Sequence, residues 1–192
     1  MFNELSRYAD GRAGPGAWTT IRQAAGLPSD FFLVTDNYPD EDFMALCVQA
    51  ASRTGQSLEA LLQDFGTFLV DGLLGIYGSL VDPKWDVLGF LEHTEDVIHR
   101  AVRIANPEAR PPALKVLRTS EDEVTVIYRS PRRLCALACG IIAGVAQHYE
   151  SPVRIHQDTC MHRGDPECRI RVATGEPIRS RPTITAGDAG AI

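Results

Sequence analysis

Three polar side chains alternate at the end of a strand-like run in the second half of the sequence. Tyr128, Ser130 and Arg132 lie two residues apart, and in an extended chain residues at this spacing point to the same side. They offer two hydroxyl groups beside a planar, bidentate cation, a combination suited to holding carboxylates. Upstream, His99 offers an imidazole nitrogen to a metal. A ligand that carries both carboxylates and such a metal is haem, with its propionates on Arg132 and its iron on His99.

The helix that carries His99 is predicted from Asp86 onward by apolar residues at helical spacing. A second histidine, His93, lies on the same segment. At about 100° per residue, His93 falls nearly opposite the apolar stripe and His99 on its flank. Periodicity therefore favours His99 only slightly, and a solvated helix residue is the simplest alternative for either histidine.

The segments around these residues resemble the haem nitric oxide/oxygen-binding (H-NOX) domains, which are marked by Tyr-x-Ser-x-Arg between a strand and a helix. This triplet alone is weak, but its companions occur in the family's order over most of the chain. They are the segments 17–21, 25–27, 64–66, the helix containing His99, 106–112 and 140–142.

The resemblance implies a five-coordinate ferrous haem b with His99 as the proximal ligand and Tyr128, Ser130 and Arg132 on the propionates. The distance from His99 to Pro112 matches the family, in which this proline packs against the haem and helps to distort it. An ordinary loop proline fits the sequence equally well. Without His99, the triplet would be read as a strand end with an exposed arginine.

Ligand selectivity depends on the distal side of the haem. Family members that hold O2 present a distal tyrosine from the helix after Arg132, because bound O2 acquires partial negative charge. The matching residues here are Leu137 and Ala138, with Ile141 one turn later, and none donates a hydrogen bond. We therefore expect a sensor of NO (and CO) that excludes O2.

The resemblance also implies how the signal would arise. NO binding opposite His99 weakens the iron–histidine bond and lets the helix that carries His99 relax, which is a two-state element biased by a ligand. No kinase, cyclase or DNA-binding segment is recognisable. The signal is therefore expected to pass to a separate partner, a histidine kinase or a cyclic-di-GMP enzyme.

A second set of chemically active residues lies near the end of the sequence. Cys160, His162 and Cys168 flank a Gly-Asp-Pro turn, and Cys135 precedes them on the predicted helix. Such Cys/His sets in a reducing compartment favour structural zinc, and a subset of bacterial H-NOX domains has a similar cluster. We expect Cys135, Cys160 and Cys168 as ligands, with His162 as the fourth and His156 in reserve. Ordinary free cysteines are the alternative, and Cys139 is expected to be a packed core thiol.

The pattern of elements predicts an α+β fold. Helical periodicity dominates the first half, with a loop expected around Gly72, Gly75 and Gly78, and the second half reads β-β-α-β-β, which predicts an antiparallel sheet. We expect one H-NOX domain over residues 1–175 and a disordered tail over 176–192.

Composition limits the function classes. The 192 residues are 44% hydrophobic and carry a net charge of −6 without a basic run, so nucleic acid is not an expected partner. No apolar stretch approaches the roughly 20 residues of a membrane span, and we expect a cytoplasmic protein. No arrangement typical of an enzyme's active site occurs.

Two alternatives to the gas sensor stay open. The chain begins a few residues later than is usual for the family, which favours a thiol/zinc redox sensor with weak or absent haem. A small-molecule-binding domain of the 4-vinyl-reductase type would account for residues 128–168 but not for the helical first half.

Overall fold

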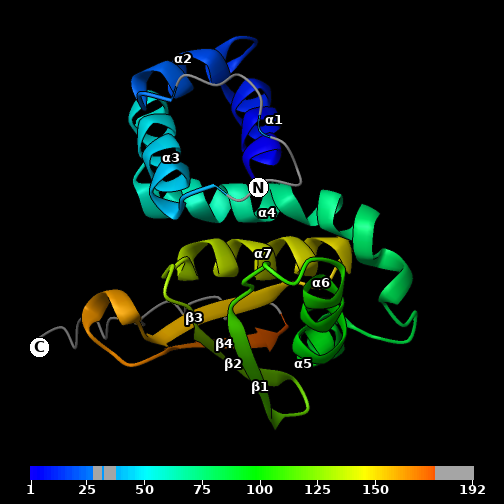
Figure 1. Cartoon of the computed structure of the whole chain (residues 1–192). Coiled ribbons are helices and arrows are strands. Elements are labelled where there is room, and N and C mark those ends of the chain that lie inside the picture. Colours follow the sequence, from blue (N-terminus) through cyan, green and yellow to red (C-terminus); the bar gives the residue numbers. More distant parts are fainter. Residues whose placement is uncertain (28–31, 33–37, 176–192) are drawn as a thin grey trace, which may run out of the picture.

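The computed structural model describes residues 1–27, 32 and 38–175. Within this part, helices fill the first half of the chain and the second half adds a four-stranded sheet, as the sequence predicts (Figure 1). The helical elements are α1 Phe2–Ala13, α2 Ala17–Ala24, α3 Asp40–Thr54, α4 Leu58–Tyr77, η1 Gly78–Leu80, α5 Val87–His93, η2 Thr94–His99, α6 Arg100–Ala105, α7 Cys135–His148 and η3 Met161–Arg163. The strands are β1 Ala113–Ser120, β2 Glu123–Arg129, β3 Val153–Thr159 and β4 Cys168–Thr174. The predicted tail, residues 176–192, lies outside the described residues.

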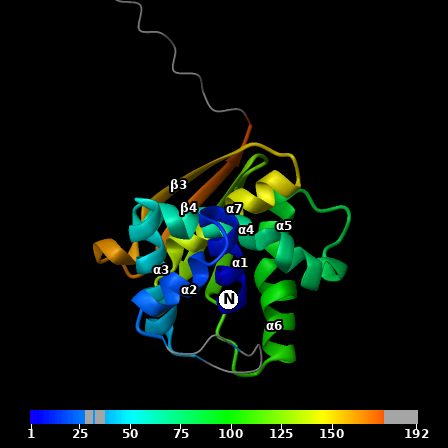
Figure 2. The ribbon, with the colours of Figure 1, turned by 90° about the horizontal axis from the view of Figure 1, so that it is seen from above.

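The elements form layers. In Figure 1, α1, α2 and α3 lie above α4, α7 lies directly below α4, and the sheet lies below α7 with α5 and α6 beside it. Seen from above, α2 and α3 lie on one side of α1, and α5 and α6 lie on the other (Figure 2).

The longest helix, α4, extends further than the sequence predicts. Its start is fixed by Ser57, whose hydroxyl accepts a hydrogen bond from the amide of Ala60 at 3.1 Å, as an N-cap residue should. The loop expected around Gly72, Gly75 and Gly78 is wrong, because the helix runs on through Gly72 and Gly75 to Tyr77 and is followed directly by η1. Burial of Val70 and packing of Leu74 against the core outweigh the roughly 1 kcal/mol that each glycine costs a helix.

Helices α4 and α7 pack backbone to backbone. A Cβ atom added at Gly66 would lie 2.4 Å from the carbonyl oxygen of Leu137, and one at Gly140 would lie 2.0 Å from the carbonyl oxygen of Gln63. Thr67 Oγ1 donates a hydrogen bond of 3.1 Å to the carbonyl of Gly140 across the same contact. Glycine is required at this crossing because any side chain would push the helices apart.

The sheet has the order β1-β2-β4-β3, and every neighbouring pair is antiparallel. Alternate residues of β2 and β4 are buried, and those between them are exposed or partly exposed except for Ala173, which is also buried. One face of the sheet is therefore covered and the other faces solvent, which is the usual arrangement of an antiparallel sheet. The buried residues of the inner face include Val124, Val126, Tyr128, Cys168, Ile170 and Val172.

Two hydrophobic cores result from this arrangement. One lies among α1 to α4 and includes the start of α7, where Leu134 and Leu137 contribute. The other lies between α7, α5 and the inner face of the sheet, and it contains the thiols of Cys135, Cys160 and Cys168. Ile141 packs against both cores, so α7 connects the two halves of the molecule.

Candidate functional site

His99 lies at the end of η2, a short π-helical segment between α5 and α6. π-helical turns inside α-helices are frequent at functional sites. The imidazole is mostly enclosed, with 15% of its side-chain surface exposed, and its Nδ1 lies 2.9 Å from Oε2 of Glu95. Because an ionised carboxylate only accepts hydrogen bonds, Nδ1 must carry the proton. The other ring nitrogen, Nε2, is then the one that is free to bind a metal.

The side-chain carboxylate of Glu95 makes three contacts. It accepts hydrogen bonds from His99, from Arg103 at 2.8 Å and from the backbone amide of Leu114 at 3.1 Å. Burial alone would raise the pKa of Glu95, but these three hydrogen bonds outweigh it and lower the pKa. Glu95 was not among the predicted site residues, although its position four residues before His99 places both on one helix face.

Tyr128 and Ser130 alternate with exposed residues as predicted, whereas Arg132 lies in the turn after β2 and is half-buried. Tyr128 and Ser130 are 2% and 8% exposed, whereas Arg129 and Pro131, the residues that follow each of them, are exposed. The Tyr128 hydroxyl accepts a hydrogen bond of 3.1 Å from the amide of Leu134, so its proton is available to another acceptor. Burial raises the pKa of Tyr128, which keeps this hydroxyl a neutral donor at physiological pH.

Arg132 is the member of the triplet that best tests the fit of a carboxylate ligand. Its guanidinium lies over the ring of Phe43, and its Nε is 2.8 Å from Oδ1 of Asp40 at the start of α3. The geometry of that contact does not make a hydrogen bond, and Arg132 Nε is buried without one. A buried N–H group without a hydrogen bond is costly, and an anionic group such as a propionate would satisfy it.

The other predicted haem residues lie on two further elements of the fold. Pro112 is half-buried and comes directly before β1, two residues from the amide that Glu95 binds. Leu137 and Ile141 lie on α7 where its backbone meets Gly66 of α4. His93 lies apart from His99: its ring stacks on Trp85 with 4.5 Å between centroids, and its Nδ1 bonds the carbonyl of Gly89.

Three of the predicted metal ligands come together. Cys135 begins α7, Cys160 precedes η3 and Cys168 begins β4, yet their Sγ atoms all lie within 4.8 Å of one another. All three are buried, and the Sγ atoms of Cys135 and Cys160 are 3.8 Å apart without a disulfide bond. This grouping of thiols suits a metal that prefers sulfur ligands, such as zinc.

Backbone amides near the three thiols favour their negatively charged, thiolate form. The amide of Met161 lies 3.3 Å from Sγ of Cys168 as a donor. Burial raises the pKa of Cys135 to about 12 and also raises the pKa of Cys168. Burial acts in the same direction on Cys160, but the amides of His162 and Arg163 and the adjacent thiols outweigh it and lower its pKa. Amide donors to sulfur of this kind stabilise the thiolates that a metal requires.

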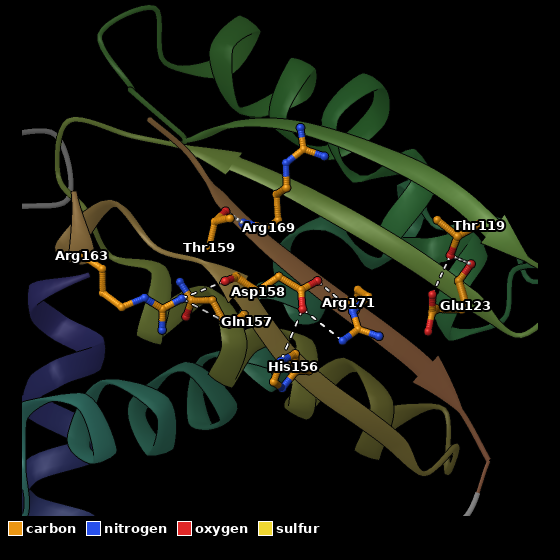
Figure 3. A network of polar contacts seen from close by, with 9 residues as sticks. All are labelled: Thr119, Glu123, His156, Gln157, Asp158, Thr159, Arg163, Arg169 and Arg171. Carbon is orange, nitrogen blue, oxygen red and sulfur yellow. Dashed lines mark hydrogen bonds and ion pairs between the residues drawn. The ribbon is translucent and has the colours of Figure 1, made fainter. Parts of the chain in front are cut away.

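The two histidines considered for a fourth ligand do not join the thiols. His162 Nε2 lies 2.7 Å from the carbonyl oxygen of Arg133, the residue with a φ of 50° that turns the chain into α7. His156 contacts Asp158 at 3.3 Å and is exposed (Figure 3). In that figure the Asp158 carboxylate also binds Arg171, an exposed residue between buried ones in β4. The predicted core thiol, Cys139, is buried at 8% exposure.

Comparisons with known proteins agree with this architecture. The family model described as haem-NO-binding matches residues 1–157. An H-NOX protein from S. oneidensis in its Fe(II)NO state is 27% identical, with a TM-score of 0.85 over 91% of this chain and 97% of that one. The Fe(II)CO form of an H-NOX domain from Shewanella oneidensis is 26% identical, with a TM-score of 0.83 over 92% and 97% of the two chains. An H-NOX protein from K. algicida shares the fold at 20% identity and a TM-score of 0.82, over 94% and 97%. A comparison with curated proteins gave no match.

The chain belongs to the haem-NO-binding (H-NOX) family. Proteins of this family bind haem and gaseous ligands, and they act as sensors that signal to partners rather than as enzymes. Among the described residues of this chain, no helix combines the length and the apolar character needed to cross a membrane.

Proposed function

We propose that this protein is a haem-based sensor of NO, and also of CO, with His99 as the axial ligand of a five-coordinate ferrous haem b. The observation that carries the proposal is the enclosed imidazole of His99, whose Nδ1 is occupied by Glu95. Nε2 is therefore the ring nitrogen that remains to bind the iron. A haem bound there supplies an iron atom with one open position for a diatomic gas.

The anchor for the propionates is assigned to Tyr128, Ser130 and Arg132. The hydroxyl of Tyr128 is held in place by the amide of Leu134, and Ser130 accepts the amide of Arg132 at 3.2 Å. Arg132 would exchange its contact with Asp40 for a carboxylate that also satisfies Nε. We assign Pro112, which lies next to β1, to packing against the haem.

Selectivity for NO over O2 is attributed to Leu137 and Ile141. Neither side chain donates a hydrogen bond, and Leu137 is 6% exposed within an apolar core. Bound O2 needs such a donor because it carries partial negative charge, whereas NO does not. The likeness to structures with Fe(II)NO and Fe(II)CO ligation at 27% and 26% identity supports these ligands.

The signal is assigned to movement of the helix that contains His99. η2 and α6 follow one another without a break, and η2 contacts β1, so a shift of His99 would act on the edge of the sheet. We propose a cytoplasmic protein and a separate signalling partner, a histidine kinase or a cyclic-di-GMP enzyme. The gaseous ligand would then favour one of two positions of the helix that contains His99, and a sensor requires such a ligand-dependent change.

The test is an absorption spectrum of the purified, reduced protein before and after addition of NO, in air and without air. We expect one high-spin ferrous Soret band that shifts with NO and CO and does not form an O2 complex. A protein that binds none of the added haem, and so is colourless once free haem is removed, would overturn the proposal.

A second function is carried by the three-thiol cluster, which we propose as a zinc site and a redox sensor. Support comes from the short distances among Cys135, Cys160 and Cys168 and from the amides directed at their sulfur atoms. His162 is the proposed fourth ligand, and binding would require its ring to leave the carbonyl of Arg133. Zinc measured on the same reduced sample tests this site, and oxidation of its thiolates would give a response that does not need haem.

A further inference from the structure

Glu95 connects the proposed iron ligand to the edge of the sheet. One of its oxygens, Oε2, is shared between Nδ1 of His99 at 2.9 Å and the amide of Leu114 at 3.1 Å, and the other, Oε1, binds Arg103 at 2.8 Å. Since β1 is an edge strand, some of its amides have no partner strand. A carboxylate that satisfies such an amide ties the helix of His99 to β1 over 19 residues of sequence.

We propose that Glu95 is the residue that positions His99 for iron and sets the strength of the iron–histidine bond. The inference rests on the proposed function in one respect, that His99 is the axial ligand. A carboxylate on Nδ1 selects one tautomer, orients the ring and makes the imidazole a stronger donor to a metal. A displacement of His99 would also act on the backbone of Leu114, because both residues bind the same oxygen atom of Glu95.

The surrounding contacts explain why this carboxylate is well placed to act. Arg103 lies one turn beyond His99 on the same helix and holds the second oxygen, so the carboxylate cannot rotate freely. The side chain of Glu95 is 26% exposed, so its hydrogen bonds are partly shielded from water. Shielded charge-assisted hydrogen bonds are stronger than exposed ones.

The chain provides a matched control. Glu92 lies one turn earlier, has a similar exposed fraction of 27%, and is paired with an arginine, Arg118. It makes no contact with His99 among the interactions described. Glu92→Gln therefore removes a carboxylate of the same kind from the same helical segment and leaves His99 and Leu114 as they are.

The experiment compares the wild type with Glu95→Gln, Glu95→Ala and Glu92→Gln in the reduced, haem-loaded protein. Glutamine keeps the shape of Glu95 and loses its charge, so we expect bound haem with a lower iron–histidine stretching frequency in resonance Raman spectra. Alanine should also reduce haem affinity by roughly 10–100-fold, the usual effect of removing a partner of a metal ligand. Glu92→Gln should match the wild type in both measurements.

A purely structural role predicts a different result. If Glu95 only ties the helix to β1, Glu95→Gln and Glu95→Ala would accelerate amide hydrogen exchange at Leu114 without changing the stretching frequency, and that result would overturn the proposal. Arg103→Gln serves as the comparison for structure alone, because it removes one contact of Glu95 and leaves the contact with His99.

A measurement without haem separates this inference from the proposed function. ¹⁵N NMR of the histidine rings in the haem-free protein should show His99 as the tautomer with the proton on Nδ1, and Glu95→Gln should produce a mixture of tautomers. The same tautomer in both proteins would refute the role of Glu95. An iron–histidine band that survives His99→Gly would instead refute the axial ligand.

Discussion

Gly140 of α7 faces the carbonyl oxygen of Gln63 in α4 so closely that a methyl group at Gly140 would lie 2.0 Å from that oxygen. The approach is made by two backbones and cannot be relieved by rotation of a side chain. Helix α7 also carries Cys135, Leu137 and Ile141, so this contact fixes the position of residues from both candidate sites relative to the first half of the molecule.

Replacement of Gly140 by alanine is therefore expected to destabilise the fold by about 3 kcal/mol, the upper end of the range that is typical of overpacked cores, because α4 and α7 must separate. Gly75→Ala is the control, because Gly75 is an exposed residue of α4 with nothing within 4 Å of an added Cβ. That substitution should stabilise the helix by up to about 1 kcal/mol. Urea unfolding followed by circular dichroism measures both effects, and equal stabilities would contradict the packing described.

His99→Gly should abolish the iron–histidine bond and lower haem retention, because no other ring nitrogen is held in this place. Free imidazole should restore haem binding by entering the space that the ring leaves. His93→Gly is the matched control, since His93 stacks on Trp85 and bonds Gly89, and it should keep the wild-type spectrum. Identical haem spectra for His99→Gly and the wild type would rule out His99 as the axial ligand.

Leu137→Tyr is expected to add O2 binding to a protein that otherwise excludes it, because a phenol at this position donates a hydrogen bond to bound O2. Leu137→Phe provides the same ring without the hydroxyl and should not bind O2. Leu137 is buried among apolar side chains, so circular dichroism should accompany the spectra. O2 binding by both variants would show that space, rather than the hydrogen bond, determines selectivity.

Serine at Cys135, Cys160 or Cys168 should each lower the zinc content of the purified protein, since the three sulfur atoms lie within 4.8 Å of one another and are the proposed ligands. Cys139→Ser should not, because Cys139 lies outside this cluster and its pKa is raised to about 12 by burial. Elemental analysis of the four variants measures the difference. Removal of zinc by a chelator should also reduce stability, as binding to the folded state alone predicts. Equal zinc in all four would argue against the site.

Cys47 should resist alkylation in the folded protein. Its side chain is fully buried, and burial raises its pKa to about 12, so at pH 8 the thiol is protonated and only about one molecule in 10⁴ carries the reactive thiolate. Intact mass after treatment with iodoacetamide should show no modification of Cys47 until denaturant is added. Modification at the same rate with and without denaturant would contradict the packing of α3.

Local sequence pattern was sufficient for several features. Alternation at Tyr128 and Ser130 follows from the two-residue period of an extended chain, and the burial of these two residues against exposed neighbours confirms it, whereas Arg132 lies in the turn after β2 and is half-buried. Helical periodicity predicted the first half, and the change of period predicted the antiparallel sheet. Both signals arise from backbone geometry over a few residues, so they are visible without the rest of the fold.

Contacts between distant segments were decided by tertiary packing alone. Sequence spacing does not show that Glu95 binds the amide of Leu114, or that Arg132 meets Asp40. It also placed His162 among the thiols, whereas the turn at Arg133 offers that ring a carbonyl instead. The physical reason is the same in each case: local periodicity determines which face a side chain occupies, and the packing of helices and strands determines what that face meets.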